Sequence, residues 1–228
     1  MSDPVVTTAR ATASGAATAL SPEATKVLRN TYALLSLSVL FSAATATASV
    51  AMKLPHPGLL ITLVGYFGLL FAIHKFRNSA AGIGLVFALT GFMGLTLGPL
   101  LSAVLSMPGG GATVANALGL TGAVFLGASG YVLTTRKDLS WMGTTLFAGV
   151  LVAFLAGLAA VFFEMPALSL AVSALFAILM SAMIAFETSA IIHGGERNYI
   201  MATVSLFVSL FNLFASLLQL LGFAGGDE

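Results

Sequence analysis

Cysteine is absent from the 228 residues, and charged residues make up only 7% of them. Without cysteine the chain can form neither a disulfide nor a thiolate metal site. An ordinary soluble domain is about a quarter charged, whereas 58% of this chain is hydrophobic and its mean hydropathy is +1.04. The composition excludes an ordinary soluble domain and indicates an integral membrane protein. The net charge of +1 gives no sign of a nucleic-acid partner.

Residues that intramembrane enzymes need are also scarce. No pair of aspartates lies within an apolar run, which excludes an aspartyl protease. The segment GASG at 127–130 fits the GxSG pattern of rhomboid-type serine proteases. Its serine, Ser129, would need a general base, but His56, His74 and His193 fall in links or at helix ends. We therefore expect no enzyme, and the scattered ligand residues predict no metal site and no cofactor.

Apolar runs long enough to cross a hydrocarbon core of about 30 Å recur seven times. Short polar links separate them, so successive helices should run antiparallel in one compact bundle. The predicted spans are 31–52, 58–73, 80–105, 112–134, 140–163, 166–192 and 199–223. We thus predict an all-α integral membrane protein, with a seven-helix transmembrane domain over 21–228 and a tail over 1–20.

Lysine and arginine gather on one side of the predicted bundle. Eight of them lie in the N-terminal tail, at the start of the first helix or in the second, fourth and sixth links, against Lys53 alone on the other side. The eight are Arg10, Lys26, Arg29, Lys75, Arg77, Arg136, Lys137 and Arg197. Because cytoplasmic loops are enriched in these residues, we expect a cytoplasmic N-terminus and a C-terminus across the membrane.

Residues 1–20 are rich in Ala and Thr and lack the continuous apolar core of a signal peptide. We interpret them as a disordered cytoplasmic tail, and on composition alone it is simply a fraying terminus. Order should begin at Ser21, because the segment Ser-Pro-Glu supplies an N-cap, a first-turn proline and a carboxylate at the positive end of the helix dipole.

Small and polar residues form stripes at helical spacing on three predicted helices. The last helix carries Ser205, Ser209, Asn212, Ser216 and Gln219. The first carries Ser38, Ser42, Thr45 and Ser49, and the third carries Gly84, Ala88, Gly91, Gly94, Gly98 and Ser102. Helices in lipid associate through small residues and hydrogen bonds, so we expect these faces to meet in the bundle interior, either in dry packing or around water.

Two further features fall inside predicted spans. Pro99, after Gly98, has no N–H for the carbonyl of Leu95, so the third helix should kink there, as a hinge or as a fitted bend. Glu187 is the one ionisable residue placed within a span, where a charge costs at least about 2.5–3.5 kcal/mol. It therefore needs a proton, water or a partner.

Glu187 lies near the cytoplasmic end of its span, within reach of His193, Arg136 or Arg197. A proton- or ion-sensing role and a purely structural role both remain open for it.

Several motifs, taken together, resemble the Bax inhibitor-1 family. They are LTGFMGLTLGPLL (89–101), YVLTTRKDLSWMG (131–143) and a carboxylate in the sixth helix followed by NLF (212–214). Others resemble bacterial inner-membrane members of that family, namely KVLRNTY (26–32), LPHPGLLITLVG (54–65) and FETSAIIHGGERNYIMATVSL (186–206). The resemblance implies six helices around a central seventh, or around a sixth–seventh core, and an inner-membrane location with the C-terminus in the periplasm.

The resemblance also implies two activities. Some members are similar to pH-sensitive calcium leak channels, in which two aspartates on the last two helices share a proton. The matching positions here are Glu187 and Ser209, with Asn212 nearby, so the carboxylate pair is missing and Ca²⁺ is only weakly supported. Bacterial inner-membrane members instead imply a partner, the FtsH protease with HflK and HflC.

From the resemblance we therefore expect a regulatory protein that binds FtsH through its tail, with residues such as Met1, Ser2, Asp3 and Arg10. It would be a slowly degraded substrate and a competitor of other substrates. The alternative is a calcium, cation or proton leak gated at Glu187.

Overall fold

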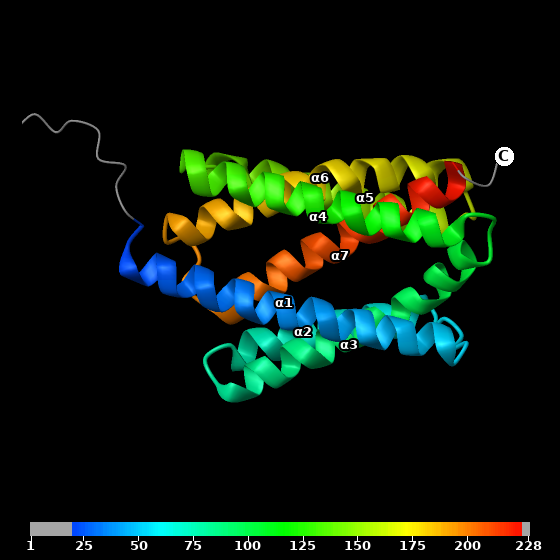
Figure 1. Ribbon diagram of the computed structural model, residues 1–228, viewed down its shortest axis with the longest axis horizontal. Coiled ribbons are helices and arrows are strands. Elements are labelled where there is room, and N and C mark those ends of the chain that lie inside the picture. The colour runs from blue at the N-terminus through cyan, green and yellow to red at the C-terminus, as the bar shows by residue number, and fades with distance from the viewer. Residues whose placement is uncertain (1–19, 225–228) are drawn as a thin grey trace, which may run out of the picture.

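The computed structural model describes residues 20–224, which form seven long α-helices and one short 3-10 turn (Figure 1). The elements are α1 (Pro22–Ala51), α2 (Leu59–Phe76), α3 (Ala80–Leu105), α4 (Gly110–Thr135), η1 (Ser140–Met142), α5 (Gly143–Phe162), α6 (Pro166–Ile192) and α7 (Tyr199–Ala224). Within the described residues, seven helical segments are long and apolar enough to cross a membrane. The predicted all-α seven-helix membrane fold is confirmed.

Helix α1 begins nine residues before the first predicted span, at the capping signal. The N–H of Ala24 donates to Oγ of Ser21 at 3.1 Å, and Pro22 and Glu23 occupy the first turn. This cap satisfies one of the free N–H groups of the first turn. The expected protease-engaging residues Met1, Ser2, Asp3 and Arg10 lie outside the described residues.

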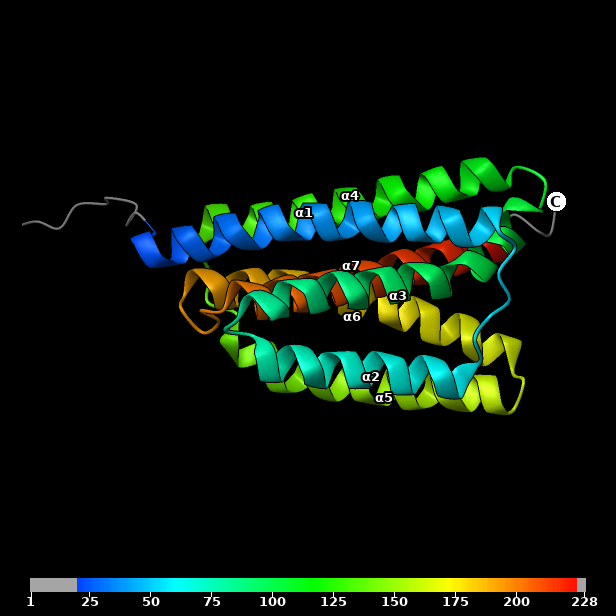
Figure 2. The same cartoon turned by 90° about the horizontal axis from the view of Figure 1, so that it is seen from below.

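Helix α7 runs through the middle of the bundle. Figure 1 shows it crossing diagonally between a group formed by α4, α5 and α6 and a group formed by α1, α2 and α3. It contacts α6, α1, α4 and α3, whereas α2 packs mainly on α3 and α5 mainly on α6. In Figure 2 both α2 and α5 lie at the lower edge, and Phe67 of α2 meets Phe154 of α5 with ring centroids 6.1 Å apart. This arrangement agrees with a central seventh helix.

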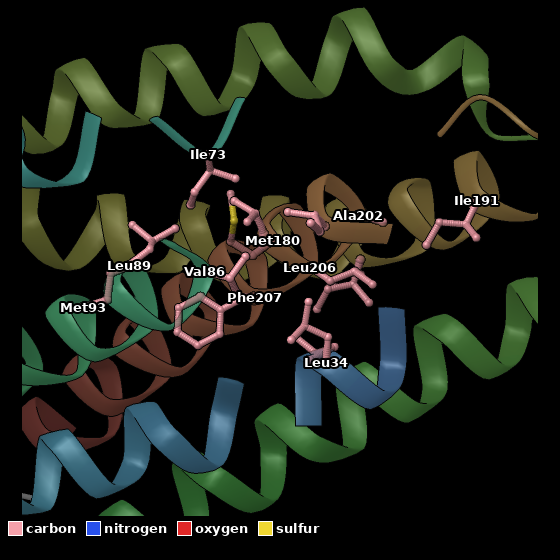
Figure 3. Close-up of a cluster of buried hydrophobic side chains, with 14 of the residues drawn as sticks. Leu34, Ile73, Val86, Leu89, Met93, Met180, Ile191, Ala202, Leu206 and Phe207 are labelled. Atoms are coloured by element: carbon pink, nitrogen blue, oxygen red, sulfur yellow. The ribbon is translucent and has the colours of Figure 1, made fainter. Parts of the chain in front are cut away.

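The largest cluster of buried apolar side chains surrounds the first half of α7 (Figure 3). Ala202, Leu206 and Phe207 of α7 meet side chains from four other helices there. These include Leu34 of α1, Ile73 of α2, Val86, Leu89 and Met93 of α3, and Met180 and Ile191 of α6. Because lipid is as apolar as these side chains, the cluster stabilises the bundle by close packing rather than by removal from water.

The small-residue face of α3 packs against the Ser/Thr face of α1. A Cβ on Gly94 would collide with Oγ1 of Thr45 and the carbonyl oxygen of Ser42, and one on Gly98 would collide with Ser49. Glycine at these positions therefore lets the two backbones approach, as expected for helices in lipid.

The beginning of the predicted α3 stripe was placed wrongly in the interior. Gly84 and Ala88 are exposed, and an added Cβ on Gly84 would meet nothing within 4 Å. The α1 side chains that contact this face meet Gly91, Gly94 and Gly98, which leaves its first residues uncovered.

Candidate functional site: a polar cluster on α6

Three consecutive polar residues of α6 are buried in the bundle. Glu187, Thr188 and Ser189 are 8%, 0% and 1% exposed. Successive residues of an α-helix point about 100° apart, so the three side chains reach three different neighbours. We call these residues the α6 polar cluster.

Glu187 is bound by the central helix α7. Ser209 Oγ lies 3.0 Å from Oε1 and 3.1 Å from Oε2 of the carboxyl group. A hydroxyl has one proton to donate, while a protonated carboxyl supplies a second donor. Both contacts are therefore full hydrogen bonds when Glu187 is neutral.

Thr188 joins α6 to α4. Its Oγ1 lies 3.2 Å from Oγ of Ser129 and donates to the carbonyl of Ile184 at 2.8 Å. The bonded neighbour of Ser129 is thus another hydroxyl, which cannot act as the general base that a serine nucleophile needs. The geometry gives no support to Ser129 as a catalytic residue.

Ser189 and His193 hold the α4–α5 link (residues 136–139) against the end of α6. Ser189 Oγ donates to the carbonyl of Lys137 at 3.0 Å and accepts the N–H of Leu139 at 3.0 Å. The ring nitrogens of His193 lie 2.9 Å from the carbonyl oxygen of Ser189 and 3.1 Å from that of Arg136. Side chains of α6 thereby fix the position of a link that carries two basic residues.

The residues named as possible partners of Glu187 make other contacts in the structure. His193 binds backbone carbonyls, Arg197 donates from Nε to the carbonyl of Gly194 at 3.3 Å, and Arg136 meets His193 only through its backbone. Asn212 does not reach Glu187 either, because its Nδ2 donates to the carbonyl of Val208 in its own helix at 2.8 Å. Of the proposed set, the structure brings together Glu187 and Ser209.

The far end of the α7 stripe makes a second contact with α6. Gln219 accepts a hydrogen bond from Ser173 Oγ through Oε1 and donates from Nε2 to Ser169 Oγ, both at 2.7 Å. The only sequence signal for this pair of serines is their spacing of four, which places them on one helix face. Two members of the stripe, Ser209 and Gln219, therefore bind α7 to α6.

The described residues offer few ligands for a metal ion. Between residues 20 and 224, no three His, Cys, Asp or Glu side chains lie together as a group that could hold a metal ion. The α6 polar cluster offers one carboxyl group and several hydroxyls, whereas Ca²⁺ takes six to eight oxygen ligands. In this cluster, the chemistry is hydrogen bonding between helices.

Comparison with known proteins agrees with this architecture. The family model described as inhibitor of apoptosis-promoting Bax1 matches residues 24–226. The modulator of FtsH protease YccA from Escherichia coli K12 is 56% identical over 202 residues, covering 89% of this chain and 92% of that protein. An uncharacterised protein of Pseudomonas aeruginosa is 53% identical over 206 residues, covering 90% and 93%.

A more distant relative gives the same coverage. An uncharacterised membrane protein of Vibrio cholerae is 42% identical over 207 residues, covering 90% of this chain and 93% of its own. The matches extend over nearly the whole helical bundle rather than over a single motif. The resemblance found from the motifs is confirmed, and the chain belongs to the Bax inhibitor-1 family.

Proposed function

We propose that this protein is a bacterial inner-membrane regulator that binds the ATP-dependent membrane protease FtsH. In this proposal it is a slowly degraded substrate that competes with other substrates for the protease. The observation that carries the proposal is the 56% identity, over 89% of this chain, to the modulator of FtsH protease YccA. An inner-membrane location follows from the same similarity, since the relative in another Escherichia coli strain is named an inner membrane protein.

Interhelical bonds give a physical reason for slow degradation. A protease that extracts the chain must separate α7 from α6, which breaks the bonds of Ser209 to Glu187 and of Gln219 to Ser169 and Ser173. If it pulls from the N-terminus, it must first separate α1 from the closely packed face of α3. Polar groups exposed to lipid by these steps would be left unsatisfied, which is costly in hydrocarbon.

The N-terminus is the proposed point of engagement. Among the described residues, Lys26 and Arg29 at the start of α1 lie at the same end of the bundle as the α2–α3, α4–α5 and α6–α7 links (Figures 1 and 2). We call this the basic end. The positive-inside rule supports placing it in the cytoplasm, where the tail over 1–20 would be in reach of FtsH and its companions HflK and HflC.

Co-purification and turnover test the proposal together. The tagged, mildly solubilised protein would be isolated from its native membrane, and FtsH, HflK and HflC would be sought by mass spectrometry. Turnover would be followed for the full chain, for a deletion of 2–20 and for a control in which 2–20 is replaced by a Gly/Ser segment of equal length.

We expect FtsH to co-purify, the deletion to slow turnover and the replacement to restore it. If the protein is isolated without FtsH under conditions that keep other membrane complexes intact, the proposal is wrong. If the deletion leaves turnover unchanged, the tail is not the point of engagement.

The leak alternative has no comparable support. Ser209 stands where a second carboxylate would be needed to share a proton, and it is already bound to Glu187. Protein reconstituted in calcium-loaded or pH-jumped liposomes tests this alternative directly. We expect no leak above that of empty liposomes, whereas a leak abolished by Glu187→Gln would establish the channel.

A further inference from the structure

A cavity of about 500 Å³ lies at the basic end, between the α2–α3 link (residues 77–79) and the α6–α7 link (residues 193–198). Both links belong to the same end of the bundle in the two views of Figures 1 and 2. The cavity is lined by Arg77 from one link and Arg197 from the other, and no acidic residue is among its lining residues. Its lining thus carries two positive charges, while the carboxylate of Glu196 accepts the N–H of the lining residue Asn198 at 2.7 Å.

Asn198 connects the two links and so sets the distance between the arginines. Its Nδ2 donates to the carbonyl of Arg77 at 2.9 Å and to Oδ1 of Asn78 at 2.8 Å. Its Oδ1 accepts the N–H groups of Ile200 and Met201 at 3.0 and 3.1 Å, which caps α7. Because both ends of its side-chain amide are hydrogen-bonded within the protein, Asn198 positions the two links rather than binding a ligand. The charged donors of the cavity are the guanidinium groups of Arg77 and Arg197.

Arg197 is itself oriented by a local bond. Its Nε donates to the carbonyl of Gly194 at 3.3 Å, which leaves the other donors of the guanidinium for a ligand. A guanidinium presents its N–H groups in a planar fork that matches two oxygens of a phosphate. Arg77 and Arg197 both line this cavity, so their side chains are chemically suited to an anionic phosphate group.

The position of the cavity along the membrane spans distinguishes a lipid headgroup from a free phosphate ion as the ligand. Helix α2 ends at Phe76, whereas α3 begins at Ala80 and α7 at Tyr199, so the cavity lies where three membrane spans end. Ile83 and Ile200 are among its lining residues, and Phe76 is 44% exposed immediately before Arg77. Basic side chains at the level where membrane spans end, next to apolar side chains, fit a lipid headgroup better than a free ion.

A second cavity at the same end has a different charge pattern. It measures about 620 Å³ and lies between the start of α1 and the α6–α7 link. Its lining includes Glu23 and Glu196 together with Lys26 and Arg197. Because acidic and basic groups are mixed there, it does not select an anion as the first cavity does.

We propose that the cavity between Arg77 and Arg197 binds the phosphodiester headgroup of an anionic phospholipid. The two arginines contact the phosphate, and the acyl chains extend past Phe76 into the bilayer. Such a lipid joins the α2–α3 link to the α6–α7 link and supports the start of α7. This site is independent of the proposed binding of FtsH.

The test titrates phosphatidylglycerol into the full-length protein held in phosphatidylcholine–detergent micelles, with bound lipid counted by native mass spectrometry. We expect phosphatidylglycerol to be retained in preference to phosphatidylcholine. The double variant Arg77→Gln/Arg197→Gln should weaken its binding about tenfold or more, since hydrogen bonds to charged groups are lost. The matched control is Arg29→Gln/Lys137→Gln, which removes two exposed charges that do not line the cavity.

Each other outcome overturns the lipid site. Equal retention of the two lipids by the wild-type protein would show that the cavity does not select an anionic lipid. An equal loss of phosphatidylglycerol binding in the two double variants would indicate binding to diffuse surface charge. Displacement of the lipid by inorganic phosphate at matched concentration assigns the cavity to a free anion instead. If the cavity variant keeps the lipid but no longer co-purifies FtsH, the two arginines form a protein contact.

Discussion

Ser49 of α1 donates its hydroxyl proton to the carbonyl oxygen of Leu95 in α3, across 3.0 Å. Leu95 lies four residues before Pro99, which is inside α3 and has no N–H to give to that carbonyl. Close contact of Gly98 with Ser49 brings the hydroxyl within reach. The bond compensates for the proline through the packing of α1 on α3, which favours a fitted bend over a hinge.

Ser49→Ala should therefore destabilise the bundle, because the carbonyl of Leu95 would be left without a donor in the membrane interior. We expect a loss of about 0.6 kcal/mol in the free energy of unfolding, and at most about 1.7 kcal/mol, the average and maximum measured for interhelical hydrogen bonds in a membrane protein. Equilibrium unfolding in mixed micelles measures it. Thr47→Ala is the control, because Thr47 is exposed on the same helix and donates to the carbonyl of Ala43 in its own helix.

Gly94→Ala should destabilise the contact of α1 with α3 through overpacking. The new methyl group would overlap Oγ1 of Thr45 and the backbone carbonyl of Ser42, and backbone atoms cannot move aside cheaply. We expect a loss of about 1–3 kcal/mol. Gly84→Ala in the same helix meets open space and should be neutral or stabilising by up to about 1 kcal/mol. Equal effects of the two substitutions would contradict the assigned packing face.

If FtsH pulls from the N-terminus, these two variants should also be degraded faster. Helix α1 would be the first span extracted, and both substitutions weaken its hold on α3. The turnover of Ser49→Ala and Gly94→Ala, each beside its control, would be compared by pulse-chase. Stability loss without faster turnover would indicate that extraction of α1 does not limit degradation.

The helices were largely predictable because their signals are local. Apolar length and short links located the seven spans, and the capping signal at Ser21 gave the start of α1. The Ser/Thr face of α1 was correctly assigned to the interior because a spacing of three or four residues defines one face of any helix. These patterns do not depend on how the neighbouring helices are placed.

The partners of the polar residues were less predictable because they depend on how helices rotate against one another. From its place in the chain, Glu187 could reach His193 or an arginine as readily as Ser209. Asn212 satisfied its amide on the carbonyl four residues earlier, a local competition that spacing alone does not resolve. Burial of Ser129 against Thr188 likewise follows from the crossing of α4 and α6.

Glu187 and Ser209 should show energetic coupling in a double-mutant cycle. Ser209→Ala leaves the buried carboxyl group without its partner, so we expect a loss of about 1–3 kcal/mol in stability. In a Glu187→Met background the same substitution should cost close to nothing, because no carboxyl group remains to be satisfied. Equilibrium unfolding of the four proteins gives the coupling.

Ser216→Ala serves as the control for this cycle, since it removes another buried hydroxyl of α7. Its cost should be the same with glutamate or methionine at position 187. Equal costs of Ser209→Ala in the two backgrounds would mean that the contact contributes nothing to stability.

Asn198 should prove necessary for the order of the basic end, because it caps α7 and also bridges to the α2–α3 link. Asn198→Ala removes both roles and should cost about 0.5–2 kcal/mol through the cap alone. Asn198→Ser keeps a capping oxygen but is too short to supply the bridging amide. Hydrogen exchange should therefore speed up in both the first turn of α7 and residues 77–79 for Asn198→Ala, and only in residues 77–79 for Asn198→Ser. Identical exchange patterns in the two variants would show that cap and bridge are not separable.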